Sequence, residues 1–288
     1  WIGVLGAAVI GSGVALFLCA YKKKGQKASP GRRKAATGVL LICIAMAVGS
    51  GFMLAREIGQ YKESADTYAG LSEYVTPAET DGENGTVEAP EETGASSISL
   101  PTVDFESLLA QGPDVKAWLE LPGTVIQYPV AHNSYYLKHL YDGTANKVGC
   151  LFIDYENAED FSDNNTIIYG HNMRDGSMFS TLVEYKAQAY YDEHPEMYLV
   201  TPEGGYVVEV FSAFVASPEE SGSETSPWAL EWKDSGAYTT WLSAMQERSV
   251  IETGVSVTSS DKVLTLSTCT NGGADRFIVM GRLVAVTE

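Results

Sequence analysis

The residues with the clearest potential for chemistry lie near the end of the chain, where an apolar segment stops at a cysteine. Residues 265–269 have the sequence TLSTC, and Arg276 follows seven residues after Cys269, at the head of a second apolar run. The polar, glycine-rich stretch between them predicts a turn, and the two strands of a hairpin bring their ends together. A cysteine reacts as its thiolate and needs a cationic or basic neighbour and a donor for the oxyanion that forms. The pattern therefore predicts a thiol and a guanidinium side by side, although a strand-end cysteine that simply packs remains an alternative.

A group for proton transfer must come from elsewhere in the chain. His171 directly follows residues 166–170, an apolar run that ends in glycine, so its ring is expected at the end of a strand. Taken alone, such a histidine is more often structural than catalytic, and both interpretations stay open. The other three histidines are expected on the surface or in packing: His132, His139 and His194.

The elements that must position these side chains are mostly short strands. Strand-like runs occupy residues 125–130, 150–153, 166–169, 197–200, 206–215, 262–268 and 277–286. Seven or eight short strands in about 180 residues predict a closed or nearly closed β-barrel. Helices are expected at residues 105–109, capped by Asp104, and at residues 115–119, 135–140, 177–185 and 235–246.

The chain of 288 residues carries its charge very unevenly. Residues 1–62 hold nine of the 19 basic residues and one of the 37 acidic residues, so the remainder is strongly acidic. Residues 1–21 and 38–55 contain no charge and are each long enough to cross a bilayer. The basic loop at residues 22–37 is expected in the cytoplasm by the positive-inside rule, which places the acidic remainder outside the cell. A cleaved signal sequence is the alternative for residues 1–21.

The remainder of the chain divides at a change in composition. Residues 56–102 are expected to form a stalk and an acidic disordered linker, because residues 75–101 hold six acids, three prolines and no basic residue. Residues 103–288 are expected to form an extracellular domain. Its acidic surface argues against nucleic acid as a partner.

Other site chemistries find little support in the sequence. The chain has neither a Gly-x-Ser-x-Gly nor a His-Glu-x-x-His motif, which disfavours a serine hydrolase and a zinc peptidase. A calcium site among the acidic side chains of residues 154–163 is conceivable, but a solvated loop is favoured, since the spacing of an EF-hand loop is absent. A single Cys150–Cys269 disulfide is formally possible in an oxidising compartment.

Four segments taken together resemble a known family. Residues 165–173 (NTIIYGHNM), residues 178–179 (MF), the TLSTC pentad and Arg276 resemble the sortases, and specifically the class B sortases. The resemblance runs from about Val103 to Val286 and includes a helix-bearing insertion between late strands, residues 218–250. It implies a mainly β fold, a sortase-like eight-stranded β-barrel with N-terminal helices and a helix-bearing late loop, preceded here by two membrane helices where most relatives have a single anchor.

The resemblance also implies an activity. It implies a cysteine transpeptidase at the cell membrane, in which Cys269 forms a thioacyl intermediate with a sorting signal of a secreted protein. His171 would serve as acid and base, and Arg276 would stabilise the oxyanion or the substrate backbone. The acceptor would be an amine of a peptidoglycan precursor or of a pilin-like subunit, and neither metal nor cofactor is called for. The competing hypothesis is a non-catalytic surface adhesin or receptor built on the same barrel.

The resemblance assigns three further residues to the substrate groove. These expected substrate-binding residues are Asn133, Leu137 and Ser267.

Overall fold

The computed structural model describes residues 30–77 and 99–286. The first predicted membrane helix, half of the basic loop and most of the acidic linker therefore lie outside the described residues. Contacts divide the chain into two compact units, residues 1–63 and residues 64–288, and each is considered by itself.

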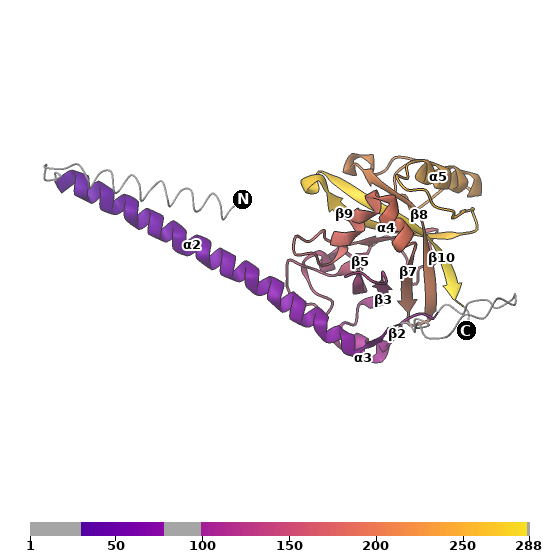
Figure 1. The fold of residues 1–288 in the computed structure, drawn as a ribbon, viewed down its shortest axis with the longest axis horizontal. Helices are drawn as coiled ribbons and strands as arrows, with labels where there is room; N and C mark the ends of the chain where they lie inside the picture. Colours follow the sequence, from indigo (N-terminus) through magenta and orange to yellow (C-terminus); the bar gives the residue numbers. More distant parts are fainter. Residues whose placement is uncertain (1–29, 78–98, 287–288) are drawn as a thin grey trace, which may run out of the picture. The chain divides into compact units, whose positions relative to one another are not determined.

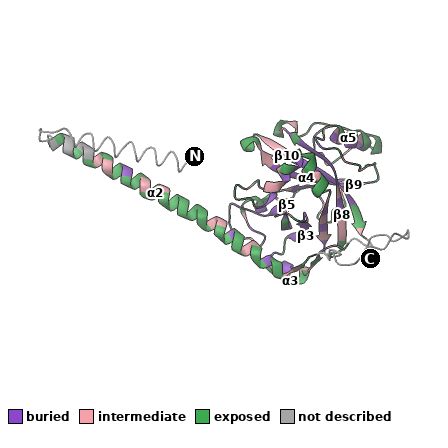
Figure 2. Cartoon of the chain, in the orientation of Figure 1, coloured by how far each residue is buried: buried purple, intermediate pink, exposed green. Residues whose placement is uncertain are grey.

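The first unit contains most of a single long helix, α2 (Pro30–Ala69). The helix includes the second predicted membrane segment, residues 38–55, and it continues through residues that were expected to form a stalk. Figure 2 shows α2 exposed along most of its length. Its exposed side chains include large apolar ones: Leu41, Ile42, Val48, Phe52 and Met53. Within the described residues it is the one helix long and apolar enough to cross a membrane.

The end of α2 belongs to the second unit and packs there. Leu71, in the short 3₁₀ helix η1 (Gly70–Glu73), is 1% exposed, and the Tyr68 hydroxyl donates to the Gly149 carbonyl at 2.6 Å. The strand β1 (Val75–Thr76) then pairs with β2 (Thr102–Val103), which lies after the acidic linker. The folded unit thus takes chain from both sides of the linker, whereas the sequence placed its start at residue 103.

The second unit is a closed eight-stranded barrel, as the sequence predicted (Figure 1). The strands are β3 (Val115–Glu120), β4 (Gln127–His132), β5 (Leu151–Ile153), β6 (Asn165–Tyr169), β7 (Glu196–Thr201), β8 (Gly204–Ala216), β9 (Lys262–Thr270) and β10 (Asp275–Val286). They follow the order β10-β8-β7-β3-β4-β5-β6-β9, and β9 closes the barrel against β10. The β4–β5 and β6–β9 pairs are parallel, and the others are antiparallel.

One expected helix is wrong. Residues 115–119 were expected to be helical, but they form β3, which pairs with β4 on one side and with β7 on the other. Almost every side chain of β3 is buried, and Ala117 and Leu119 are fully so. A strand buried on both faces loses the alternation of polar and apolar residues, so its pattern resembles that of a short helix.

Four helices lie near the expected positions: α3 (Phe105–Gln111), η2 (Ser134–Lys138), η3 (Phe179–Lys186) and α5 (Ser235–Glu247). Three short helices were not predicted: α4 (Gln188–Glu193), η4 (Pro218–Glu220) and η5 (Asn271–Gly273). Asp104 caps α3, as predicted, by accepting a hydrogen bond from the Ser107 amide at 3.1 Å. The two expected helices at residues 135–140 and 177–185 are 3₁₀ helices, η2 and η3.

The insertion between β8 and β9 covers one face of the barrel. Its helix α5 begins at the cap Asp234, whose carboxylate accepts from the Ala237 amide at 2.9 Å. Tyr238 and Trp241 of α5 are buried in one hydrophobic cluster with Val263 of β9 and residues of β8 and β10. Side chains alternate along a strand, so the residues of β9 on the face of Val263 are those at 265, 267 and 269.

Candidate active site

The β9–β10 hairpin places the predicted nucleophile opposite the predicted arginine. Cys269 and Arg276 are direct partners in the antiparallel register, as the sequence analysis expected. The turn between them is η5, in which Asn271, Gly272 and Gly273 have φ values of 49°, 69° and 96°. Three successive left-handed residues are tolerated because two are glycine and the third is asparagine. This tight turn keeps the two strand ends adjacent.

The two side chains are only partly shielded from solvent. Cys269 is a free, half-buried thiol. The Arg276 guanidinium donates from Nη1 to the carbonyl oxygens of Gly273 and Asp275, each at 3.1 Å. A guanidinium carries five N–H groups, so most of its donors are left for a bound group.

His171 follows directly after β6, and a glycine allows the approach. A Cβ atom on Gly170 would lie 2.5 Å from Leu151 Cδ2 and 2.5 Å from Phe179 Cδ2. A glycine therefore allows the backbone to pass this close to the Leu151 and Phe179 side chains. The Phe179 amide donates to the His171 carbonyl at 3.0 Å and fixes the backbone of the histidine.

Hydrogen bonds join the histidine segment to the cysteine strand. β6 and β9 are parallel, and the register ends with Tyr169 opposite Ser267. Beyond that pair, the Thr268 hydroxyl donates to the Gly170 carbonyl at 2.8 Å. Asn172 Nδ2 then donates to the Cys269 carbonyl, also at 2.8 Å. The structure therefore brings the segments of His171, Cys269 and Arg276 together at one end of the barrel.

The imidazole of His171 is held by a backbone carbonyl. Its Nε2 lies 2.9 Å from the oxygen of Leu137 in η2. A carbonyl can only accept, so Nε2 carries the proton and the N–H donates to it. Among the described residues, no hydrogen bond occupies Nδ1. Nδ1 of the imidazole is thus the nitrogen left to exchange a proton with a bound group.

The three expected substrate-binding residues occupy different environments. Leu137 is 38% exposed and adjoins His171 through its carbonyl. Asn133 has a φ of 72° and caps η2, where its side-chain oxygen accepts from the Tyr135 amide at 2.9 Å. Ser267 is 2% exposed, and Trp228 Nε1 of the insertion donates to its hydroxyl at 3.3 Å. Contact of these residues with substrate stays a prediction.

Two side chains that hold the site together, Asn172 and Tyr169, were not predicted from the sequence to do so. Asn172 directly follows the histidine, and its position beside the motif was the one available signal. Tyr169 precedes the glycine, and its hydroxyl donates to Asp154 at 2.9 Å. Burial and the neighbouring Asp154 carboxylate raise the pKa of Tyr169 well above its usual range, so this hydroxyl stays protonated and keeps its hydrogen bond.

The acidic loop between β5 and β6 uses several of its carboxylates internally. Asp154 and Asp163 each accept hydrogen bonds from groups of their own loop. Glu159 contacts Lys116 Nζ at 2.8 Å and His132 Nδ1 at 3.2 Å. Within residues 30–77 and 99–286, no cluster of three potential metal-binding side chains occurs.

The possible disulfide between Cys150 and Cys269 is not formed. Both Cys150 and Cys269 are free thiols. Cys150 is buried at the start of β5, and its Sγ donates to the Pro129 carbonyl at 3.1 Å. Burial raises the pKa of Cys150 to about 12. This thiol is therefore a packing residue, unlike the half-buried Cys269.

Comparison with known proteins agrees with this geometry. A family profile described as the sortase domain matches residues 119–284, more than half of the chain. The chain belongs to the sortase family. It is 33% identical to sortase B of Listeria monocytogenes over 187 residues, covering 63% of this chain and 74% of that protein. It is 30% identical to sortase B of Staphylococcus aureus over 189 residues, covering 64% and 75%.

Solved structures of this family have the same fold. The structure of a Staphylococcus aureus sortase B–substrate complex is 30% identical, with a TM-score of 0.59, covering 64% of this chain and 85% of that one. A Bacillus anthracis protein described as similar to sortase B is 28% identical, with a TM-score of 0.61, covering 79% and 97%. These matches make the chain a sortase-type cysteine transpeptidase of class B, as the resemblance implied.

Proposed function

We propose that the chain is a membrane-anchored transpeptidase that cleaves a sorting signal in secreted proteins and transfers the acyl fragment to an amine of the cell wall or of another protein. The observation that carries the proposal is the direct pairing of Cys269 with Arg276, beside the hydrogen-bonded segment of His171. One sortase B structure is described as a substrate complex and another as complexed with Gly3. Both descriptions support a peptide donor and an amine acceptor for this chain.

The first half of the reaction forms a thioester on Cys269. The thiolate attacks the carbonyl carbon of the scissile peptide bond, and the electron pair moves to the carbonyl oxygen. When the tetrahedral intermediate collapses, the carbon–nitrogen bond breaks and protonated His171 donates a proton to the departing amine. The acyl group then remains bound to Sγ.

The second half releases the acyl group to the acceptor. His171, now neutral, takes a proton from the incoming amine as that amine attacks the thioester carbon. The carbon–sulfur bond breaks, the thiolate leaves, and a new amide bond forms. Water in place of the amine would give hydrolysis.

Arg276 is proposed to stabilise negative charge in both tetrahedral intermediates. Its Nη1 is held by the backbone carbonyls of Gly273 and Asp275, which restrains the guanidinium of the residue paired with Cys269 while other N–H groups remain available. Donors held in place before the reaction are worth on the order of 10² or more in rate.

The membrane location rests on the N-terminal part of the chain. The exposed apolar side chains of α2, which would be unfavourable in water, support a membrane span. The basic residues that precede the span favour a cytoplasmic N-terminal side and a barrel outside the cell.

The test uses the full chain in detergent with peptides that carry sorting signals, with and without triglycine as the amine. We expect cleavage by the wild-type chain, and adduct formation when triglycine is present. Cys269→Ala should abolish both, and His171→Ala or Arg276→Ala should each lower turnover by on the order of 10² or more. Cys150→Ala is the matched thiol control and should retain activity.

Circular dichroism separates a chemical role from a structural one. Each inactive variant should keep the wild-type spectrum, and a lost spectrum would make the residue structural. Cleavage by Cys269→Ala would overturn the thioacyl mechanism. A wild-type chain that binds sorting peptides and never cleaves them would favour the adhesin or receptor hypothesis.

A further inference from the structure

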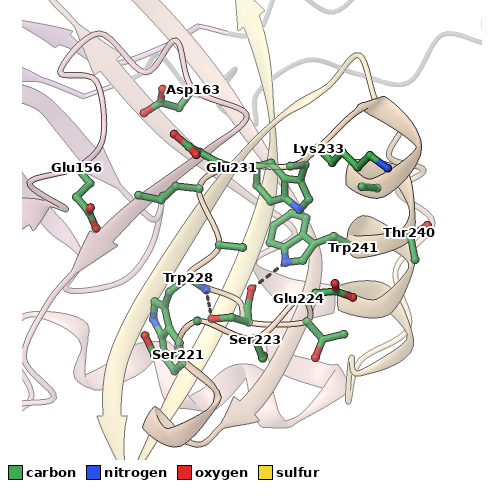
Figure 3. Close-up of a pocket in the computed structure, with 17 residues that line it drawn as sticks. Glu156, Asp163, Ser221, Ser223, Glu224, Trp228, Glu231, Lys233, Thr240 and Trp241 are labelled. Carbon is green, nitrogen blue, oxygen red and sulfur yellow. Dashed lines mark hydrogen bonds between the residues drawn. The ribbon is translucent and has the colours of Figure 1, made fainter.

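An open cavity of about 1220 Å³ lies between the insertion and the β5–β6 loop (Figure 3). Residues 221–233 and one face of α5 line most of it. Glu156 and Asp163 line it from the β5–β6 side. None of the predicted catalytic residues is among the lining residues, so the cavity is distinct from the site of the chemistry.

The cavity connects to the catalytic strand through Trp228. This side chain lines the cavity, and its Nε1 donates to the Ser267 hydroxyl. Ser267 precedes Cys269 by two residues on β9, so both side chains lie on the same face of the strand. Two residues of a strand span about 6.6 Å, so the Ser267 side chain that Trp228 contacts lies roughly that far along the strand from Cys269.

The walls of the cavity carry unpaired negative charge. Glu156, Glu224 and Glu231 line it, and none of these carboxylates makes a hydrogen bond or ion pair with another described side chain. Lys233 is the one basic residue in the lining, and it forms no ion pair with them. Figure 3 shows its side chain extending away from Glu156 and Glu231. A cationic occupant would therefore meet uncompensated carboxylates.

Two half-buried indole rings, Trp228 and Trp232, line the cavity together with these carboxylates. Trp241 also lines it, but it is 2% exposed and its ring packs against Trp232 and Tyr238, so it supports the Trp232 ring from behind. Trp241 is fixed by its own hydrogen bond, from Nε1 to the Ser226 carbonyl at 2.8 Å. The Nε1 of Trp232 is buried and has no hydrogen-bond partner among the described residues. Aromatic faces beside carboxylates favour ammonium and guanidinium groups.

We propose that this cavity binds a lysine or arginine side chain of the donor peptide, two to four residues from the bond that is cleaved. The proposal rests on the proposed function, because it takes the donor to be a peptide whose carbonyl lies at Cys269. An extended peptide advances about 3.3 Å per residue, so a side chain at that separation reaches past Ser267 into the cavity. The acceptor amine must touch the thioester carbon itself, which excludes it as the group held beyond Ser267.

Binding is measured first, so that the result does not depend on catalysis. The full-length Cys269→Ala chain in detergent is titrated with N-acetyl-Gly-Gly-Lys-Gly-Gly-amide, and tryptophan fluorescence reports occupancy. The matched peptide with norleucine in place of lysine has the same length and no charge. We expect the lysine peptide to bind about fivefold to tenfold more tightly, and the difference to shrink with added salt.

Charge-neutral variants assign the effect to the cavity. Adding Glu224→Gln together with Glu231→Gln to the Cys269→Ala chain should abolish its preference for the lysine peptide over the norleucine peptide. Adding Glu247→Gln, an exposed residue of α5 outside the cavity, should preserve it. Equal binding of the two peptides by the Cys269→Ala chain would overturn the proposal. So would a preference that survives in the double variant.

Cleavage of a randomised peptide library by the full-length chain with Cys269 intact then separates the two proposals. Enrichment of lysine or arginine at one position within four residues of the cleaved bond, lost with Glu224→Gln and Glu231→Gln, supports the assignment to the donor. A basic preference found only in the amine acceptor would overturn that assignment. A lysine preference in binding with no cleavage of any peptide would refute the transpeptidase proposal and leave the cation site standing.

Discussion

At the scale of single residues, Asn172 links the two halves of the candidate site. It directly follows His171, and its Nδ2 donates to the Cys269 carbonyl. The side chain is exposed, so its removal should cost the fold little. The bond nevertheless holds the nucleophile's backbone against the histidine segment, which makes Asn172 a positioning residue.

Asn172→Ala should therefore lower kcat about fivefold to tenfold, the equivalent of one hydrogen bond of about 1 kcal/mol, while KM and Tm stay near the wild-type values. Peptide-cleavage kinetics and thermal unfolding measure these quantities. Asn172→Gln keeps an amide donor and should recover part of the loss. Gln127→Ala removes another exposed amide, bonded to the Thr124 carbonyl, and should leave kcat unchanged. An unchanged kcat in Asn172→Ala would contradict the positioning role.

The thiols of Cys150 and Cys269 should differ in how their reactivity depends on pH. Burial raises the pKa of Cys150 to about 12, so its thiolate is scarce at every pH below that value and increases only as pH rises toward it. Cys269 is half-buried and lies at the end of its strand. We expect iodoacetamide to label the folded chain at Cys269 and to spare Cys150 from pH 6 to about pH 9.

Peptide mapping by mass spectrometry reads out this labelling. Cys269→Ala should remove the label, and Cys150→Ala should not. Labelling of both thiols in urea would show that the fold protects Cys150. Labelling of Cys150 in the folded chain at neutral pH would contradict its burial.

The pairing of Cys269 with Arg276 could be predicted from the sequence because a short polar turn between two apolar runs fixes a hairpin. The contacts of His171 and its neighbour Asn172 could not be predicted in this way. The carbonyl partner of His171, Leu137, lies 34 residues away, and Asn172 and the Cys269 carbonyl are 97 residues apart. Such contacts form only when the barrel closes, and the pattern of apolar and polar residues within one segment does not predict them.

At the scale of elements, the insertion is attached to the barrel by Asn165 at the start of β6. The side chain is fully buried, and its Nδ2 donates to the Pro227 and Ala229 carbonyls at 3.1 and 2.9 Å. Its Oδ1 accepts from the Thr265 hydroxyl at 2.6 Å. One amide thus joins the insertion to two neighbouring strands.

Asn165→Ala should destabilise the folded chain by about 2–3 kcal/mol, because it leaves buried carbonyls without donors. At roughly 2–4 °C per kcal/mol for a unit of this size, Tm should fall by about 4–12 °C. Thermal unfolding measures the shift. Thr239→Ala, which removes an exposed hydroxyl on α5, is the control and should change Tm little. A Tm equal to that of the wild type would mean that α5 packing alone holds the insertion.

β9 and β10 were predictable because their long apolar runs lie on either side of a polar, glycine-rich turn. β3 was not, since it is short and Trp118 is buried as well as Val115, Ala117 and Leu119. The two-sided pairing that makes β3 a strand comes from β4 and β7, which lie later in the sequence. Only tertiary contact distinguishes such a segment from a short buried helix.

At the scale of the whole molecule, the chain separates an apolar, basic N-terminal part from an acidic remainder. The described part of α2 exposes Leu41, Phe52 and Met53, whereas the large side chains of the barrel are mostly buried (Figure 2). The helix thus has the surface of a segment solvated by lipid. The orientation then depends on the seven basic residues between positions 22 and 34.

We expect the loop around residue 28 to be cytoplasmic and the barrel to be extracellular. In a Cys269→Ala chain, an impermeant maleimide applied to intact cells should label Ser259→Cys, an exposed position before β9, and should not label Ala28→Cys. Lysis should expose Ala28→Cys to the reagent, and the Cys269→Ala chain alone gives the background. Labelling of Ala28→Cys in intact cells would place the basic loop outside. Because α2 with its basic flank inside fixes the same orientation by itself, protection at residue 28 does not require a first membrane helix.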